Sequence, residues 1–239
     1  YSGATLCIPS QETVKDKNEF VKFLKTTNST IVTFPPSYLG LLEAEDIEGL
    51  RCIITAGESA NATKAFEIVN SGIEYYNAYG PTECAVCVSM YKVTDKDFDK
   101  INIPIGKPIA NTQIYILDES FKPVPIGVTG KIYVSGVGIA RGYLNKNELT
   151  NEKFVSNPFI AGTRLYDTGD LGCWLPDGNV EFHGRKDSQV KLRGYRIELG
   201  EIENAVLQYS QNIKQIVVEV KEFNQENILV AYFVSPSII

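Results

Sequence analysis

The sequence predicts an α/β protein in three parts. Residues 1–104 are expected to form the second half of a βαβ sheet subdomain, residues 105–186 a small distorted β-barrel, and residues 187–239 a hinge and the start of an α+β C-terminal domain. In the first part, short apolar runs alternate with amphipathic stretches, a pattern typical of a mostly parallel sheet with helices on its faces. Of the 19 glycines, 12 fall between residues 127 and 200, which favours short strands in a barrel or bent sheet.

The elements of the first part follow from hydrophobic periodicity. Apolar runs bounded by polar residues predict strands, and apolar residues three and four positions apart predict helices. Ligands of such sheets bind at the loops that follow the carboxyl ends of the strands. The expected strands are residues 5–8, 30–33, 51–55, 75–78 and 86–91, and the expected helices are residues 18–25 and 62–69.

The remaining parts contain fewer helical patterns. A helix–strand–strand pattern after residue 200 is too small to bury a core of its own, so we expect it to begin a larger domain. The expected strands are residues 113–117, 131–135, 181–182, 216–220 and 228–234, with one helix at 202–209.

The composition excludes several classes of function. The chain has 239 residues and a net charge of 23 − 29 = −6, which argues against a protein built to hold nucleic acid. No apolar run approaches the roughly 20 residues that span a bilayer, so no membrane partner is expected. Because His183 is the single histidine, a site with several histidines is impossible, and a Ser-His-Asp triad would have to use it.

The five cysteines form an odd set without the spacing of a disulfide framework, which favours a reducing, cytoplasmic setting. Cys84 and Cys87 spell C-x-x-C, which could be a redox pair or half of a zinc site. No second pair completes four zinc ligands, so we interpret them as two ordinary small side chains.

A polar segment directly after a predicted strand offers the groups that a nucleotide needs. Residues 77–83 supply an amide, an aromatic ring, a Gly-Pro turn, a hydroxyl and a carboxylate. Such groups could contact a purine, a phosphate and a divalent cation. The alternative is a polar turn in which Tyr79 packs on the core.

Two further segments are open to more than one interpretation. Asp170, beside Gly169 at an expected strand end, could accept hydrogen bonds from two ribose hydroxyls, or could belong to a tight Asx turn. Residues 184–196 hold five basic residues in thirteen, which suits a nucleic-acid patch, a solvated connector or a hinge. No G-x-x-x-x-G-K-[ST] phosphate loop occurs in the chain.

Taken together, these segments resemble consecutive core motifs of the adenylation domains of nonribosomal peptide synthetases, within the adenylate-forming superfamily. The resemblance covers the chain from residue 1 to about residue 235. Any single motif is only suggestive, whereas four in this order are specific. The four are NAYGPTE (77–83), GVGIARGYLN with ELT (136–145 and 148–150), YDTGDL (166–171) and GRKDSQVKLRGYRIELGEIE (184–203).

The resemblance implies a two-step reaction with ATP and Mg²⁺. An amino acid carboxylate attacks the α-phosphate of ATP, and a phosphopantetheine thiol on a peptidyl carrier domain then takes the aminoacyl group. By the resemblance, Asn77 contacts the adenine amino edge, Tyr79 stacks on the ring, and Gly57 belongs to the nucleotide site. Such sites act mainly through positioning and charge stabilisation, which suits a sequence without an obvious general base.

The resemblance also assigns the residues nearest the phosphates and the ribose. Thr82 and Glu83 are the expected catalytic residues, with Thr82 at a phosphate and Glu83 holding Mg²⁺. Asp170 is expected to hold the ribose hydroxyls, with Arg185 beside it.

The resemblance also assigns a role to the basic segment, residues 185–196. Asp187 matches the hinge about which the C-terminal domain turns between the two half-reactions, and Gly194 matches the loop that faces the pantetheine tunnel. We therefore interpret residues 185–196 as hinge and loop, not as a nucleic-acid surface.

The expected substrate pocket is apolar and uncharged, so a charged substrate side chain would be left unpaired. Its small residues leave room for an aromatic ring, and the set resembles that of phenylalanine-activating domains, from which an added hydroxyl is rejected only weakly. The pocket residues present are Thr33, Ile54, Ala56, Ala78, Val86 and Cys87.

Other features limit the resemblance. Asp167 and Cys173 stand where the family commonly has basic residues, and both are expected to be surface changes.

The family's phosphate loop lies upstream and its catalytic lysine downstream of this sequence, so we expect the chain to be a fragment of a multidomain synthetase that alone forms little adenylate. The alternatives are a catalytically inactive adenylation-like binding module and an acyl- or aryl-CoA ligase.

Overall fold

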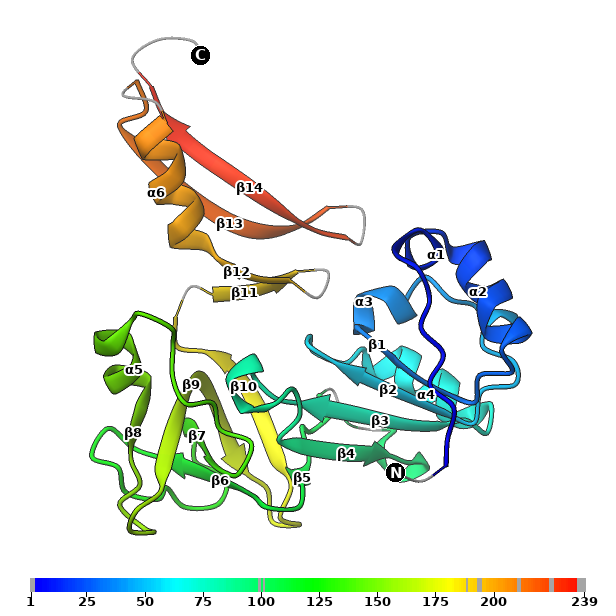
Figure 1. The fold of residues 1–239 in the computed structure, drawn as a ribbon, viewed down its shortest axis with the longest axis horizontal. Coiled ribbons are helices and arrows are strands. Elements are labelled where there is room, and N and C mark those ends of the chain that lie inside the picture. Colours follow the sequence, from blue (N-terminus) through cyan, green and yellow to red (C-terminus); the bar gives the residue numbers. More distant parts are fainter. Residues whose placement is uncertain are drawn as a thin grey trace. The chain divides into compact units, whose positions relative to one another are not determined.

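The computed structural model describes residues 3–98, 100, 102–187, 189–192, 195–209, 212–223 and 226–235 (Figure 1). The chain divides into two compact units, Tyr1–Gly184 and Arg185–Ile239. Among these described residues, the first unit contains two five-stranded sheets, and the second contains two antiparallel strand pairs and a helix. The α/β class expected from the sequence is confirmed.

The first sheet has the order β1-β2-β3-β4-β5. Strands β1, β2 and β3 are parallel, whereas β4 and β5 pair antiparallel, so the expectation of a mostly parallel sheet holds for the first three strands only. The reason is the short connection over residues 80–88, because a parallel crossover needs a dozen or more residues. The strands are β1 (Ile31–Phe34), β2 (Cys52–Ala56), β3 (Glu74–Tyr79), β4 (Ser89–Val93) and β5 (Lys107–Pro108).

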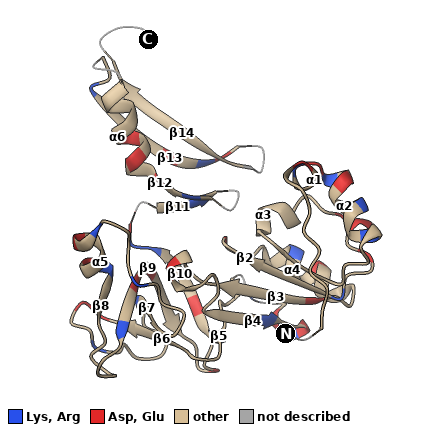
Figure 2. Ribbon diagram, viewed as in Figure 1, with Lys and Arg blue, Asp and Glu red and all other residues tan. Residues whose placement is uncertain are grey.

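Four helices precede or separate these strands, namely α1 (Gln11–Lys15), α2 (Lys17–Thr26), α3 (Pro36–Leu39) and α4 (Ala62–Asn70). The two helices expected from periodicity, α2 and α4, begin at N-caps, where Asp16 and Asn61 accept hydrogen bonds from backbone N–H groups of the first turn. Figure 2 shows basic and acidic residues interspersed along α1 and α2, as expected for solvated faces. None of the helices in the described part of the chain is long and apolar enough to cross a membrane.

The strand expected at residues 5–8 is absent, and this prediction was wrong. Leu6 and Ile8 are 83% and 78% exposed, so no neighbouring element buries this apolar run. An apolar run becomes a strand only where a sheet edge lies beside it to satisfy its backbone groups.

Helices cover one face of the first sheet. The side chains of Phe34, Ile53, Tyr75 and Val93 point to this face from successive strands, as their register requires. They pack against apolar residues of α2, α3 and α4, which are Phe20, Val21, Leu24, Leu39, Ala65, Phe66 and Ile68. The opposite face of β1–β3 carries the alternate residues of each strand.

The second sheet has the order β10-β9-β7-β6, with β8 paired to β9, and Figure 1 shows these strands side by side. Strand β9 is the longest in this sheet and was not expected from the sequence, which placed residues 166–171 at a strand end. The strands are β6 (Thr112–Leu117), β7 (Gly130–Gly136), β8 (Phe154–Ser156), β9 (Arg164–Trp174) and β10 (Val180–Arg185), and α5 (Asn147–Lys153) precedes β8. Short 3₁₀ turns η1 (Ala44–Asp46), η2 (Thr82–Cys84) and η3 (Asp95–Asp97) complete the first unit.

The second unit begins with a small antiparallel pair, β11 (Gln189–Leu192) and β12 (Tyr195–Glu198), which the sequence did not predict. The predicted helix and two strands follow as α6 (Leu199–Tyr209), β13 (Gln215–Phe223) and β14 (Glu226–Val234). The carboxylate of Glu203 accepts a hydrogen bond of 2.8 Å from the backbone N–H of Val218, which ties α6 to β13.

Alanine substitutions at two glycines test how closely the backbone approaches Gly106 in the first unit. Gly106 and Gly49 have similar positive φ angles, +85° and +88°, but a Cβ on Gly106 would lie 2.0 Å from the Met90 carbonyl oxygen, whereas one on Gly49 would meet nothing. We expect Gly49→Ala to lower the free energy of unfolding by about 1–2 kcal/mol through backbone strain. Gly106→Ala should cost a further ~1–3 kcal/mol through overpacking. Urea unfolding of both variants measures this, and equal losses would contradict the close approach.

Candidate functional site

Polar side chains gather at the carboxyl end of β3, where the sequence predicted them. Asn77 is 4% exposed, and its side-chain nitrogen donates hydrogen bonds to the carbonyls of Pro104 (2.9 Å) and Ile103 (3.4 Å). These bonds fix the orientation of the amide, so its oxygen is the atom that can accept a further hydrogen bond. An acceptor held in this way suits an exocyclic amino group.

Tyr79 connects the two sheets of the first unit. Its ring belongs to the core of the second sheet, 6.3 Å from the Phe182 ring centroid, although its backbone is part of β3. Its hydroxyl donates a 2.5 Å hydrogen bond to the carboxylate of Asp170, a residue 91 positions further along the chain. The alternative in which Tyr79 merely packs on the core is therefore incomplete, because the ring packs while its hydroxyl contacts the predicted ribose-binding carboxylate.

A bulge in β9 presents Asp170. Pairing with β7 runs from Lys131↔Leu171 to Tyr133↔Asp167, so residues 168–170 of β9 lie opposite one residue, Ile132. Gly169 adopts a φ of 74°, and the hydroxyl of Thr168 donates to the Ile132 carbonyl (2.7 Å). Bulges of this kind redirect a side chain within a strand. This corrects the expectation that the segment lies at a strand end, because Asp170 is presented from within a strand.

A second contact brings together three motif segments around Glu83. Glu83 is 8% exposed, and its Oε1 accepts a 2.7 Å hydrogen bond from the Tyr143 hydroxyl. The Tyr143 hydroxyl lies 3.2 Å from that of Tyr166. Burial, followed by the hydrogen bond with Tyr143 and the charge of Glu83, raises the pKa of Tyr166. The Tyr166 phenol therefore remains protonated beside a carboxylate.

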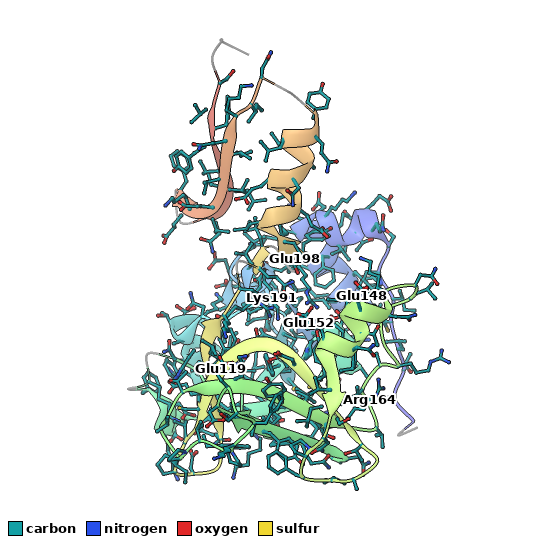
Figure 3. All side chains as sticks on the ribbon, turned by 90° about the vertical axis from the view of Figure 1, so that its left-hand side faces the viewer. Glu119, Glu148, Glu152, Arg164, Lys191 and Glu198 are labelled. Atoms are coloured by element: carbon teal, nitrogen blue, oxygen red, sulfur yellow. The ribbon has the colours of Figure 1, made fainter. Side chains whose placement is uncertain are left out.

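The segment that contributes Tyr143 is held in place by residues that sequence reasoning did not single out as site residues. Thr150 accepts a hydrogen bond of 2.9 Å from the Tyr143 backbone N–H, and a Cβ at Gly142 would lie 2.4 Å from the methyl group of Thr150. Arg164, labelled in Figure 3, donates to the carbonyls of Arg141 (2.9 Å) and Ala140 (2.8 Å). In the sequence, the spacing of the ELT and GYLN segments was the only indication that these two segments belong together. It did not reveal the role of Arg164.

The expected pocket residues of the strands share one face of the first sheet. Register pairs Thr33 with Ile54 and Ala56 with Ala78, and Ile54 and Ala56 are two residues apart on one strand, so all four point to the face opposite the helices. Thr33 is exposed, Ile54 and Ala56 are half-buried, and Ala78 is buried. The face that they form is apolar or neutral.

The loop from β3 to β4 carries the other two expected pocket residues. Val86 is 71% exposed, and Cys87 is half-buried with its thiol donating to the Ser89 carbonyl at 3.3 Å. Ala85 and Val86 have φ angles of 54° and 75°, and such an angle is an outlier for a β-branched residue. A Cβ at Gly80 would lie 2.4 Å from the Val86 carbonyl oxygen, so this loop folds closely on itself.

The remaining site candidates lie in different settings. Gly57 follows β2 with a φ of +94° and open space around its Cα, and Thr82 is exposed in η2. In the second unit, Arg185 makes a two-point ion pair with Asp187, with both hydrogen bonds 2.7 Å long. Gly194 lies outside the described residues.

The site offers one carboxylate that fits a magnesium ion. Mg²⁺ in phosphate-binding sites keeps most of its contacts to water and phosphate oxygens and needs only one or two protein carboxylates. Glu83, oriented by the Tyr143 hydroxyl, can supply one. Asn77, Tyr79 and Asp170 present an acceptor, an aromatic ring and a carboxylate, which together match the chemistry of a nucleoside.

Comparison with known proteins identifies relatives of the chain. The sequence profile of the AMP-binding enzyme family matches residues 1–144. The chain is 44% identical over 237 residues to tyrocidine synthase 1 of Brevibacillus parabrevis and 41% identical over 234 residues to gramicidin S synthase 1 of Brevibacillus brevis. Each alignment covers 98% of the chain and 21% of the relative, so the chain spans about a fifth of the length of these curated relatives.

Solved structures with a similar fold include two from peptide synthetases. Holo-PA1221, an NRPS protein containing adenylation and PCP domains bound to a vinylsulfonamide inhibitor, matches 93% of this chain and 40% of its own with a TM-score of 0.86 and 28% identity. Holo-AB3403, a four-domain nonribosomal peptide synthetase bound to AMP and glycine, matches 97% of this chain and 18% of its own with a TM-score of 0.67 and 36% identity.

The C-x-x-C pair has the properties of two ordinary side chains. Both thiols are free, and Cys84 is 3% exposed within the core of the second sheet. Burial, followed by the charge of Glu83, raises the pKa of Cys84 to about 12, and burial also raises the pKa of Cys87. A redox pair requires the opposite, a thiol with a lowered pKa.

Alkylation rates of the native chain test this conclusion. A pKa of about 12 in place of the ordinary 9.0 lowers the thiolate fraction of Cys84 at pH 8 about a thousandfold. We therefore expect iodoacetamide to modify the half-exposed Cys7 long before Cys84, with the rate at Cys84 rising about tenfold per pH unit while the fold stays intact. Mass spectrometry of the digested protein measures both rates, and equal labelling at pH 8 would contradict the burial of Cys84.

Proposed function

This chain belongs to the AMP-binding enzyme family, and we propose that it forms part of an adenylation domain that activates an amino acid with ATP. The resemblance to nonribosomal peptide synthetases inferred from the motifs is confirmed by relatives above 40% identity and by adenylation-domain neighbours. We propose that the described part binds the adenine and the ribose and forms most of the pocket for the substrate side chain.

One observation carries the proposal most directly. The Tyr79 hydroxyl and the Asp170 carboxylate meet although they are 91 residues apart, and Glu83 meets Tyr143 although they are 60 residues apart. The three motif segments therefore converge at the carboxyl end of β3, which is where a sheet of this kind binds its ligand. A structural role alone would not explain why each segment contributes a group suited to a nucleotide.

The proposed reaction has two steps. In the first, a carboxylate oxygen of the amino acid attacks the α-phosphorus of ATP, the bond to the bridging oxygen breaks, and pyrophosphate leaves with that electron pair. Asn77 would accept a hydrogen bond from the adenine amino group, Tyr79 would contact the base, and Asp170 would accept from the ribose hydroxyls. Bound Mg²⁺ would neutralise phosphate charge, with Glu83 as its protein ligand and Thr82 near a phosphate.

In the second step, a phosphopantetheine thiol attacks the aminoacyl carbonyl carbon, and AMP leaves. The thiol proton is released, and the aminoacyl group remains on the carrier as a thioester. The PCP domain named in holo-PA1221 supports a peptidyl carrier domain as the partner, and the four-domain AB3403 supports other synthetase domains as its neighbours. Asp187 is the proposed hinge and Gly194 the proposed carrier-facing residue, with Arg185 paired to the hinge carboxylate.

The proposed substrate is phenylalanine or another aromatic amino acid. Thr33, Ile54, Ala56 and Ala78 share one uncharged sheet face, and a ring buried against such a face is favoured over a charged side chain. Val86 and Cys87 would complete the wall from the adjoining loop. Gly57 is proposed to lie beside the nucleotide, where its positive φ permits the turn after β2.

Removing the ribose-binding charge tests the nucleotide site. Asp170→Asn keeps the shape but removes the charge, and we expect the kcat/KM for ATP in amino-acid-dependent ATP–pyrophosphate exchange to fall about 10- to 100-fold. The assay uses the protein that contains this chain, and Glu119→Gln, an exposed carboxylate that pairs with Lys131, serves as the matched control with unchanged exchange. An Asp170→Asn variant as active as the control would contradict the assignment. Absence of exchange by the unaltered protein would favour an inactive binding module, and transfer to free CoA would favour a CoA ligase.

Substrate preference tests the pocket. We expect exchange to be strongest with phenylalanine, weaker with tyrosine and lowest with aspartate and lysine. Ala56→Leu at the half-buried pocket position should lower exchange with phenylalanine about tenfold or more, while affecting alanine less, because the added carbons occupy the space of the ring. The melting temperature of the variant controls for folding. Strong exchange with aspartate or lysine would contradict the aromatic pocket.

A further inference from the structure

A second cluster of potential ligand atoms lies apart from the residues assigned to the nucleotide. Cys173 is on β9, and Glu181 and His183 are two residues apart on the neighbouring strand β10. One ligand atom of each lies within 4.8 Å of the other two. Cys173 is 3% exposed, which corrects the expectation that it is a surface change.

Two of the three distances within this cluster match those around a tetrahedral zinc ion. The Cys173 sulfur lies 3.7 Å from Nε2 of His183, and the same nitrogen lies 3.3 Å from Oε2 of Glu181. With zinc–sulfur bonds of about 2.3 Å and zinc–nitrogen and zinc–oxygen bonds of about 2.0–2.1 Å, a tetrahedron places sulfur and nitrogen roughly 3.5 Å apart and nitrogen and oxygen roughly 3.3 Å apart. The sulfur and a carboxylate oxygen lie within 4.8 Å of each other, so the three groups could contact one ion after a small approach of these two atoms.

The histidine ring is also oriented as a ligand requires. Nδ1 of His183 lies 2.8 Å from the hydroxyl oxygen of Thr129, which can accept its proton in a hydrogen bond. This arrangement leaves the lone pair of Nε2 directed at the sulfur and the carboxylate. Metal-bound histidines are held in the same way, by a hydrogen bond from the nitrogen that does not contact the metal.

We propose that Cys173, Glu181 and His183 form a binding site for a borderline-soft divalent cation, Zn²⁺ or its analogue Co²⁺, with Thr129 as the residue that orients the histidine. The mixed sulfur, nitrogen and oxygen set selects this class over Mg²⁺, which prefers oxygen ligands alone. Binding replaces the proton on the Cys173 sulfur, which is released to solvent, and a water molecule completes the fourth position. The ion would join β9 to β10 beyond their backbone pairing.

The test uses the full chain after treatment with a chelator. We expect Co²⁺ to produce the near-ultraviolet charge-transfer absorption of a cobalt–thiolate bond, and one equivalent of Zn²⁺ to abolish it. Zn²⁺ should also raise the melting temperature, because it binds the folded chain. A Cys7→Ser variant, which removes a thiol outside the cluster, should behave like the unaltered chain.

Variants of the cluster decide between the proposal and an ordinary contact of three side chains. Because the His183 side chain is 29% exposed, the fold should tolerate His183→Gln. This variant should weaken Co²⁺ binding at least a hundredfold, and Cys173→Ser should abolish the charge-transfer band. Thr129→Val should weaken binding about 10- to 100-fold. Absence of the band in the unaltered chain, or an undiminished band and affinity in His183→Gln, would overturn the proposal.

Discussion

The hydrogen bond between the Tyr79 hydroxyl and the Asp170 carboxylate is the contact on which the first unit depends. Asp170 is 3% exposed, and an ionised carboxylate at such depth is costly unless it is hydrogen-bonded. Tyr79 supplies a donor while its ring fills the core of the second sheet. One side chain therefore joins β3 to β9 and satisfies the polar group that the proposed function requires.

The neighbouring contacts extend the same arrangement. Glu83 is buried beside the hydroxyls of Tyr143 and Tyr166, and Thr150 holds the backbone of Tyr143. Each carboxylate near the end of β3 thus has a phenol as its partner, in a region where the surrounding side chains exclude most water. Preorganised polar groups in such surroundings need little reorganisation when a charged ligand arrives.

Much of the fold could be predicted from periodicity, because most elements have one buried and one exposed face. Helices α2, α4 and α6 and strands β1–β3, β6 and β7 show this alternation or spacing. The prediction failed where tertiary context decides: residues 5–8 are apolar but exposed, and Cys173 is buried although its position suggested the surface.

The sequence predicted candidate residues for the site but not their geometry. The order of the motifs along the chain is enough to single out Tyr79, Glu83 and Asp170, whereas their contacts depend on long-range pairing that local spacing does not encode. Arg164 is an example. Its side chain donates hydrogen bonds to the carbonyls of Ala140 and Arg141, and no local sequence pattern predicts these contacts. The glycine in the YDTGDL segment suggested a turn, and the protein uses it for a bulge.

The bulge in β9 has a consequence for how this sequence can vary. Three residues, 168–170, face the single residue Ile132, so β9 carries two additional residues, an even number. Because side chains alternate between the faces of a strand, an even insertion leaves both halves of β9 with their core residues pointing inward. A change of one residue here would have to be absorbed by a different bulge, because otherwise one half of β9, including Tyr166, would turn to the other face. The length of this segment is therefore constrained by the bulge that presents Asp170, and not only by the identity of its residues.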